Sequence, residues 1–319
     1  MKYLLLLTLL PVAGYAQQTA PVKLDLDSNC FKTITVQEQP DFLAADGNEA
    51  WVIDNTKSRI HKLEVASNKP LVTVNIAGAC AAPVIVFDAV WVMSCIEKTL
   101  YRLDKNTGKI IGKITTGVAD PNGEMAIAAG AGSVWLLTDS AGILTRVNPA
   151  NNTVQQVIQV SPGSYCAGFG FNAVWVTNYT LNTVQKIDVN TNRVTATITV
   201  GKKPRFIAVG EQGVWTLNQG DGTVTKINPV TGSVAATINV KAVGGGGDIA
   251  AGAGGVWVVS TNNQWPLQQI DPLTATIKTV YTLRPQQGQP FKVDGAVRTS
   301  KNYIWVSNLY RQTVWVLKN

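Results

Sequence analysis

The chain has 319 residues and a formal net charge of +7, and 45% of its residues are hydrophobic while only 15% are charged. This composition excludes a disordered tail and a coiled coil, and the 28 glycines and 9 tryptophans favour strands and tight turns over helices. The single histidine, His61, excludes multi-histidine metal sites and is the one candidate for a Ser–His or Cys–His pair.

The N-terminal residues have the organisation of a secretory signal peptide. Lys2 supplies the positive charge, an apolar run follows it, and the Gly-Tyr-Ala sequence at 14–16 fits a small-x-small cleavage site. We expect cleavage after Ala16, which predicts a secreted or periplasmic protein in which residues 17–30 form an N-terminal extension. No later apolar run approaches the roughly 20 residues of a membrane helix, so we expect no membrane span.

An internal repeat is the strongest signal in the chain. Tryptophan recurs between hydrophobic neighbours, at steps of 40 to 48 residues, at Trp51, Trp91, Trp135, Trp175, Trp215, Trp257 and Trp305. The unit at 204–240 divides into four short strands, which we place at 206–209, 213–217, 223–227 and 234–240. Four antiparallel strands in about 40–45 residues, repeated seven times, predict an all-β fold, a seven-bladed β-propeller.

A turn of fixed composition separates the third and fourth strands of several units. Asp or Asn opens it, Pro often follows and Gly often closes it, which is typical of a type I turn. The turn begins at Asp104, Asn228 and Asp271. Its recurrence supports the division into blades.

The two ends of the chain complement each other. The seventh unit runs out at residues 314–317 in its third strand, so its fourth strand must come from elsewhere. The segment 31–36 has the alternation of the fourth strands, and we expect it to pair with residues 313–317 and close the last blade. We therefore assign residues 31–319 to a single propeller domain, and we expect a monomer.

Polar residues recur at one position near the predicted axial mouth, where loops carry function in such folds. Three residues after each tryptophan stand Asp54, Ser94, Thr138, Asn178, Asn218, Ser260 and Asn308. The repetition favours side chains that bond their own turn backbone. A ring of hydrogen-bonding groups around a pocket is the alternative, and it makes Asn178, Asn218 and Asn308 ligand-binding candidates.

Acidic residues interrupt the repeat near this mouth. Nine residues before the tryptophan, Asp248 stands where other units have Phe, Ala or Cys, and Asp294 takes that position once the insertion in unit seven is allowed for. Glu124 lies nearby in unit three. Three carboxylates around a channel suit a divalent cation such as Mg²⁺ or Ca²⁺, or acid–base catalysis. Solvated or turn-capping acids are the simpler interpretation.

Aromatic and basic residues also depart from the repeat on this face. The candidates for ligand contact are Trp265, Tyr179, Tyr165, Tyr310 and Arg205. Such side chains suit a sugar, an aromatic compound or an anion, although exposed loop residues without a partner explain them almost as well. We expect a small molecule, a glycan or a protein as partner at the mouth. The scattered Lys and Arg residues give no basic block for nucleic acid.

Two further features have simple interpretations. His61 falls in the third strand of unit one, where we align it with Lys186 and Lys226, and this predicts a surface histidine. The four glycines at 244–247 precede no helix and therefore form no phosphate loop. We expect a flexible turn or a close approach of the backbone there.

The four cysteines predict one disulfide. Export permits disulfides, and four cysteines allow three pairings. Cys80 enters the first strand of unit two and Cys95 follows its second strand, so antiparallel neighbours can bring the Cα atoms within the roughly 4.4–6.8 Å that a disulfide requires. Cys30 and Cys166 fall at opposite ends of the propeller and should not pair. Four free thiols are the alternative.

The repeating residues resemble a known family. The segment GFGFNAVWVTN at 168–178, followed by TVQKID at 183–188, resembles the virginiamycin B lyase (streptogramin lyase) superfamily and is similar to the YVTN-type repeats of bacterial surface proteins. The resemblance covers essentially the whole mature chain and implies a propeller. Its matching residues are those that build blades, so it is specific for the fold rather than for an activity.

The resemblance also implies two enzyme types. The resemblance to streptogramin lyases implies a magnesium-dependent enzyme that opens a cyclic depsipeptide by elimination, with histidines and paired glutamates at the mouth. This chain has no histidine in units five to seven, so those residues do not carry over. Related lactonases hold a metal through Glu, Asn and Asp, a set for which the resemblance offers Glu124, Asn178, Asn218, Asp248 and Asp294.

Two functions therefore remain open. The scarcity of histidine and the regularity of the blades favour an exported binding or interaction protein without catalysis. The alternative is a metal-dependent lyase or lactone hydrolase of the streptogramin lyase or gluconolactonase type.

Overall fold

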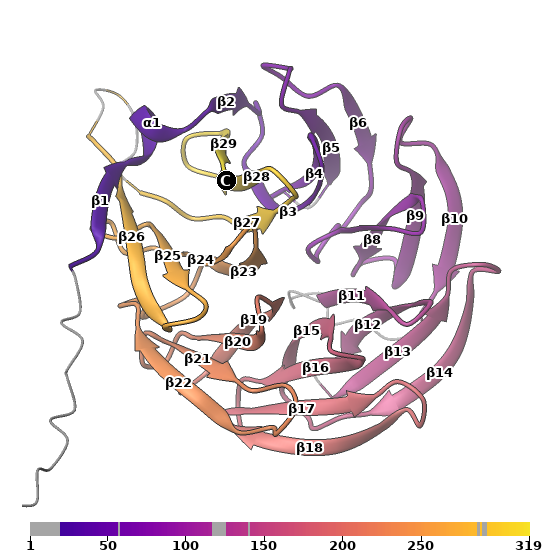
Figure 1. Cartoon of the computed structure of the whole chain (residues 1–319). Coiled ribbons are helices and arrows are strands. Elements are labelled where there is room, and N and C mark those ends of the chain that lie inside the picture. The colour runs from indigo at the N-terminus through magenta and orange to yellow at the C-terminus, as the bar shows by residue number, and fades with distance from the viewer. Residues whose placement is uncertain (1–19, 57, 117–125, 140, 286–287, 289–291) are drawn as a thin grey trace, which may run out of the picture.

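Seven small β-sheets surround a central axis in the computed structural model, as Figure 1 shows. The structure describes residues 20–56, 58–116, 126–139, 141–285, 288 and 292–319. The predicted signal peptide and its cleavage site lie outside these residues. The inner strand of each sheet contacts the inner strand of the next, and the last contacts the first, so the ring is closed. The prediction of a seven-bladed propeller is confirmed.

The first four blades are meanders of four antiparallel strands. Blade one consists of β3 (Pro40–Asp46), β4 (Glu49–Asp54), β5 (Arg59–Glu64) and β6 (Val72–Asn75). Blade two consists of β7 (Val84–Val86), β8 (Ala89–Ser94), β9 (Thr99–Asp104) and β10 (Ile110–Thr115). Blade three consists of β11 (Ala126–Gly130), β12 (Ser133–Asp139), β13 (Ile143–Asn148) and β14 (Thr153–Gln159). Blade four consists of β15 (Ser164–Gly170), β16 (Ala173–Asn178), β17 (Thr183–Asp188) and β18 (Arg193–Thr199).

Blade five has the same four-stranded plan, and blades six and seven each also contain a strand from the N-terminal segment. Blade five consists of β19 (Pro204–Gly210), β20 (Gly213–Asn218), β21 (Thr223–Ile227) and β22 (Val234–Asn239). Blade six consists of β23 (Asp248–Gly252), β24 (Gly255–Val259), β25 (Leu267–Asp271) and β26 (Thr276–Thr282). Blade seven consists of β27 (Val297–Thr299), β28 (Tyr303–Asn308) and β29 (Thr313–Lys318).

The N-terminal segment completes blade seven, as the sequence predicted. Strand β2 (Lys32–Thr35) pairs antiparallel with β29. The segment before it also forms structure that the sequence did not suggest. Strand β1 (Val22–Asp25) adds a fifth, parallel strand to the outer edge of blade six, and the short helix α1 (Leu26–Asn29) connects it to blade seven (Figure 1).

The repeated tryptophans lie in the second strands and pack between neighbouring sheets, where most are fully buried. In four blades the indole Nε1 donates to the backbone carbonyl five residues earlier. A cation from the third strand lies over each of these rings, within 5.2 Å of the centroid: Arg102, Arg146, Lys186 and Lys226. Each of these cations also donates to a carbonyl in a turn of the next blade, which ties neighbouring sheets together.

The predicted disulfide is present in blade two. Cys80 and Cys95 are bonded, with their Cα atoms 5.8 Å apart, beside the antiparallel bridge between Ala79 and Ser94. Cys30 and Cys166 are free. A disulfide fits an extracytoplasmic protein. Within the described parts of the chain, no helix is both long enough and apolar enough to cross a membrane.

Candidate ligand-binding site at the axial mouth

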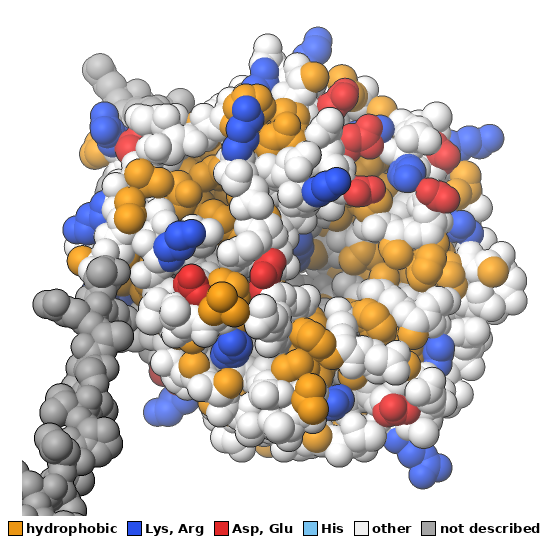
Figure 2. Space-filling model, in the orientation of Figure 1, with side chains coloured by type: hydrophobic (Ala, Val, Ile, Leu, Met, Phe, Trp, Pro, Cys, Tyr) orange, Lys and Arg blue, Asp and Glu red, His pale blue; other side chains and the backbone are white. Residues whose placement is uncertain are grey.

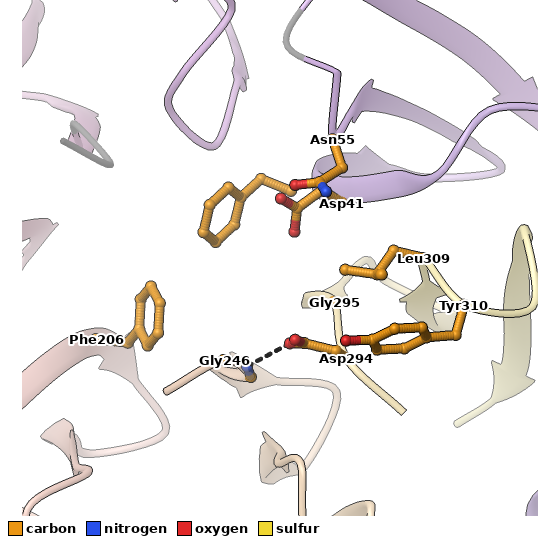
Figure 3. Close-up of a pocket in the computed structure, with 10 residues that line it drawn as sticks. Asp41, Asn55, Phe206, Gly246, Asp294, Gly295, Leu309 and Tyr310 are labelled. Atoms are coloured by element: carbon orange, nitrogen blue, oxygen red, sulfur yellow. Dashed lines mark hydrogen bonds between the residues drawn. The ribbon is translucent and has the colours of Figure 1, made fainter. Parts of the chain in front are cut away.

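A cavity of about 230 Å³ opens at the end of the propeller where the inner strands begin. Figure 2 shows a face of the molecule that is hollowed at its centre. The cavity is lined by segments of blades one, five, six and seven: Asp41, Phe42, Asn55, Phe206, Gly246, Gly247, Asp294, Gly295, Leu309 and Tyr310. In Figure 3, Asp41 and Asn55 come from one side, and Asp294, Leu309 and Tyr310 from the other. The cavity therefore has polar groups on both walls.

Two phenyl rings form the floor of this cavity. Phe42 of blade one and Phe206 of blade five approach each other across the axis, with their ring centroids 5.9 Å apart. Tyr165 packs edge-on against Phe206. Both phenylalanines are buried and are the third residues of their inner strands, so their positions are set by the blades. The same two rings also line a small space of about 50 Å³, so they lie between that space and the mouth cavity.

The glycine run brings the backbone close to Asp294. The Asp294 carboxylate accepts a hydrogen bond of 3.0 Å from the Gly247 amide. A Cβ atom added to Gly246 would lie 2.5 Å from that carboxylate, and one on Gly247 would lie 2.3 Å from the carbonyl oxygen of Val259. Both glycines have positive φ angles, 86° and 84°. The run is therefore a close backbone approach, one of the two interpretations that the sequence left open.

Tyr310 places a phenol at the edge of the cavity. Its hydroxyl accepts a hydrogen bond from the Lys292 ammonium, which also lies 4.3 Å from the centre of the Tyr310 ring. This hydrogen bond raises the pKa of Lys292, so the cation is retained at the mouth. Asn308 holds the turn from below, because its side-chain oxygen accepts from the Tyr310 amide.

Three of the predicted site residues form a second cluster beside the cavity. The Arg205 Nε donates to the Tyr165 hydroxyl at 2.8 Å, and the guanidinium lies over the rings of Tyr165 and Phe206. Tyr179 packs against Tyr165 with ring centroids 6.0 Å apart, and Lys203 lies over Tyr179. The structure thus joins Tyr165, Tyr179 and Arg205 in one cluster, but none of the three lines the mouth cavity, and Tyr165 lines a small neighbouring space instead.

Trp265 lies apart from these residues. It is in the turn between β24 and β25, half-buried, with the Lys241 ammonium 4.1 Å from its ring centre. Its backbone oxygen accepts from the Ser260 hydroxyl, which fixes the turn. It does not line the mouth cavity.

The asparagines three residues after the tryptophans are fully buried. Asn178 accepts from the amides of Thr180 and Leu181, and Asn308 accepts from the amides in the corresponding turn. Asn218 instead bonds the hydroxyls of threonines in its own blade. All three side chains make hydrogen bonds within their own blades, and none lines the cavity. The contacts of Asn178 and Asn308 match the interpretation that we favoured from the repetition, whereas those of Asn218 are to side chains and do not.

The predicted metal ligands do not form a described cluster. Glu124 lies outside the described residues. Asp248 is buried and is bonded to Arg298 and to the amides of Ile249 and Val297. Burial raises the pKa of Asp248, and the Arg298 charge opposes the rise. Among the residues that the structure describes, no group of three His, Cys, Asp or Glu side chains is arranged to hold a metal ion.

Asp294 does not share the repeat position of Asp248, so our alignment of unit seven was wrong. Arg298 pairs with Trp305 as Ala250 pairs with Trp257. Ala296 is therefore equivalent to Asp248, and Asp294 precedes it by two residues. The extra residues of unit seven all lie in the long connection between β26 and β27, before the blade begins.

The prediction of a surface histidine was also wrong. Lys62, not His61, lies opposite Trp51 in the sheet, so the alignment was shifted by one residue and His61 faces the other side. His61 is 1% exposed. Its Nδ1 is 3.0 Å from the Thr73 hydroxyl and its Nε2 is 3.5 Å from the Glu38 carboxylate. Burial lowers the pKa of His61, although Glu38 opposes this.

Sequence reasoning missed two polar residues of the cavity, Asp41 and Asn55. Asp41 lies ten residues before its tryptophan, the repeat position that also holds Tyr165 and Arg205. Asn55 lies four residues after it, at the position of Tyr179. A comparison of these two variable positions across all seven units would have found both residues.

Comparisons with known proteins agree with this architecture. No protein-family model matches the sequence, and no characterised protein matches it in a sequence search. A streptogramin B lyase structure superposes with a TM-score of 0.72 at 14% identity, covering 90% of this chain and 97% of that one. Virginiamycin B lyase from Staphylococcus aureus gives 0.70 at 13% identity, covering 90% and 99%.

A third solved structure, BamB from Moraxella catarrhalis, gives a TM-score of 0.60 at 16% identity, covering 87% of this chain and 84% of that one. The chain has the seven-bladed propeller fold. The likeness agrees with the resemblance carried by the repeat motifs. At these identities it shows the fold of the propeller, and its activity must be argued from its own residues.

Proposed function

We propose that the protein is an exported β-propeller that binds a ligand at its axial mouth without transforming it. The observation that carries the proposal is the cavity itself, with Asp41 and Asn55 on one wall, Asp294 and Tyr310 on the other, and aromatic rings as its floor. Its volume of about 230 Å³ is below that of a typical site for a whole drug-sized ligand. It suits a small molecule or one end group of a larger partner.

The chemistry of the walls favours a hydroxyl-rich end group, such as the terminal unit of a glycan. Carboxylate and amide oxygens accept hydrogen bonds from hydroxyls. Aromatic rings present an apolar surface to the C–H faces of a sugar, and the Tyr310 hydroxyl adds a polar contact. Asp294 is held by the Gly247 amide, so its position is set before a ligand arrives. Such preorganisation lowers the entropic cost of binding.

A glycan array tests this function. The mature protein should bind a subset of saccharides, and Tyr310→Ala and Asn55→Ala should each weaken that binding at least about tenfold, as loss of a wall contact implies. Tyr303→Ala is the matched control, because Tyr303 begins β28 at the end of blade seven away from the mouth. Failure to bind any saccharide, or equal loss in all three variants, would contradict the proposal.

A metal-dependent lyase or lactonase is the second candidate. The likeness to lyase structures and the two carboxylates of the cavity, Asp41 and Asp294, favour it. Calorimetric titration with Mg²⁺, Ca²⁺ and Mn²⁺ discriminates between the two functions. Saturable binding that Asp294→Asn abolishes supports a metal site at the mouth, whereas the absence of heat leaves the binding protein as the conclusion.

A further inference from the structure

A second large cavity lies on the other side of the phenylalanine floor. Its volume is about 300 Å³, and it follows the inner strands toward the end of the propeller opposite the mouth. The wall consists mainly of Ala, Gly, Val and Ile residues from blades two to six, with Arg298 and Thr299 from blade seven. Arg298 also reaches the small space of about 50 Å³ directly under Phe42 and Phe206.

Arg298 departs from the repeat more strongly than any other inner-strand residue at its position. The residue opposite the second-strand tryptophan is small in the other six blades: Ala44, Val84, Ala128, Gly168, Ala208 and Ala250. In blade seven that residue is Arg298, opposite Trp305. Blade geometry therefore accepts a small residue here and does not require an arginine.

Only one nitrogen of the Arg298 guanidinium, Nη1, makes hydrogen bonds within the described part of the chain. Its Nη1 donates to the Asp248 carboxylate and to the Val297 carbonyl. Its Nε and Nη2 make no hydrogen bond within the described part of the chain, and 28% of the side chain is exposed. These two groups form the fork that matches a carboxylate in bidentate geometry.

The ion pair with Asp248 does not by itself account for the arginine. A buried ion pair often contributes no more stability than apolar residues of similar size. Asp248 and Arg298 lie in neighbouring blades, and the equivalent residues of blades two and three are Ala82 and Ala128, so the same architecture is built there without charges. The two charged residues therefore depart from the repeat together, and they do so inside a cavity.

The backbone adds further polarity to the cavity wall. Each inner strand pairs with only one neighbour, the second strand of its blade, so its other edge faces the channel. Amide groups on such an edge are available to a ligand. Asp248 and Arg298 are the charged side chains among the described residues that line the two lower cavities, and their charges cancel. Because the net charge of the lining side chains is zero, the channel suits a ligand with one negative charge better than a ligand with two.

We propose that the lower channel binds a small carboxylate, whose head group takes the free Nε–Nη2 edge of Arg298 and whose short apolar body lies against the Ala, Gly and Val side chains of the inner strands. The site is distinct from the mouth, because the mouth cavity and the lower channel have no lining residue in common.

Calorimetric titration of the mature protein with hexanoate tests this site. We expect one saturable site for hexanoate and none for hexylammonium. Asp248→Ala combined with Arg298→Ala should weaken binding at least about tenfold, because charge-assisted hydrogen bonds are lost. This pair of alanines reproduces the combination of Ala82 and Ala128 in blades two and three, so the fold should accept it. Arg298→Lys, which keeps the charge and loses the fork, should weaken binding as well.

Two further variants separate the proposed role from a structural one. Asp248→Asn should tighten hexanoate binding, because Arg298 is then no longer shared with a second carboxylate. Tyr310→Ala, at the mouth, should leave it unchanged. The proposal is overturned if hexanoate shows no saturable binding, if the double alanine variant binds it as well as the parent, or if Asp248→Asn weakens it.

Discussion

Single aspartates hold the turns between third and fourth strands. Asp104, Asp188 and Asp271 each accept hydrogen bonds from backbone amides two and three residues ahead. The hydroxyl of the threonine three residues ahead adds a further bond, which is the main cause at Asp104, whereas the amides come first at Asp188 and Asp271. Together these bonds favour the ionised form and lower the pKa of each carboxyl. In blade five, Asn228 makes the same contacts without a charge.

Acid should therefore weaken the propeller partly through these turns. Because the folded-state pKa values are lowered, their contribution is complete above the unfolded value of about 4 and is lost as the pH falls through the folded-state values. The triple variant Asp104→Asn, Asp188→Asn, Asp271→Asn should lose less stability than the parent between pH 6 and pH 3. Urea midpoints at both pH values measure this, and equal losses would contradict it.

The thiol of Cys166 lies in the small space under the phenylalanine floor. Burial raises the pKa of Cys166 to about 11. At pH 8 only about one such thiol in a thousand is ionised, and the thiolate is the reactive form. We predict that iodoacetamide labels Cys30 faster than Cys166 in native protein, and that the two rates converge in urea. Peptide mass spectrometry over time gives both rates.

At the scale of elements, the cation above each tryptophan connects one blade to the next. Lys226 lies 5.1 Å from the centre of the Trp215 ring, and its ammonium donates to the Pro272 carbonyl of blade six at 2.7 Å. Arginine has the same role in blades two and three, where Arg102 and Arg146 lie over their tryptophans. The contact therefore tolerates either cation.

Removal of one such cation should be measurable. Lys226→Met keeps the aliphatic stem and should lower the free energy of unfolding by about 1–2 kcal/mol, from the lost cation–π contact and hydrogen bond. Lys226→Arg should retain most of the stability. Lys278→Met, where the lysine side chain is exposed on β26, is the control for loss of charge alone. Chemical denaturation compares the three variants, and equal effects of both Met variants would argue against the contact.

The strands could be predicted because their residues repeat, and the errors fall where repetition is interrupted. Alternating residues at 223–227 matched β21 (Thr223–Ile227) without change. His61 was misaligned by one residue, and in a strand such a shift moves a side chain to the opposite face. Asp294 was misaligned because the position of the insertion in unit seven is not visible from the sequence.

The candidate site was only partly predictable for a related reason. Tyr310 and Asp294 interrupt the repeat, and both line the mouth cavity. Asp41 and Asn55 were missed because acidic and amide residues are ordinary in loops, and only the closed ring brings blade one beside blade seven. The parallel pairing of β1 with β26 was also invisible, since it joins residues more than 250 positions apart.

At the scale of the whole molecule, the N-terminal segment holds the ring closed. The paired register joins Ile34 to Val314, and Ile34 is fully buried. The segment before it is tied to blade seven as well, since Arg311 donates to the Asp27 carboxylate at 2.9 Å and 3.1 Å.

Truncation should separate these contributions. A chain beginning at residue 37 lacks β1, α1 and β2, exposes the edge of β29, and should melt at a lower temperature and aggregate. A chain beginning at residue 31 keeps β2 and should remain monomeric, with a smaller loss of stability. Light scattering after size exclusion gives the association state. Monomeric, fully stable protein from residue 37 would contradict the role of β2.

The pairing of β2 with β29 also determines when the ring can close during synthesis of the chain. Strand β2 is synthesised before all seven inner strands, but its neighbour β29 (Thr313–Lys318) is synthesised after every other described strand. Until then Ile34 has no apolar surroundings, and blade seven lacks its third strand. A nascent chain released before β29 is made therefore has an open ring, and proteases can distinguish it by that gap from a chain that contains β29.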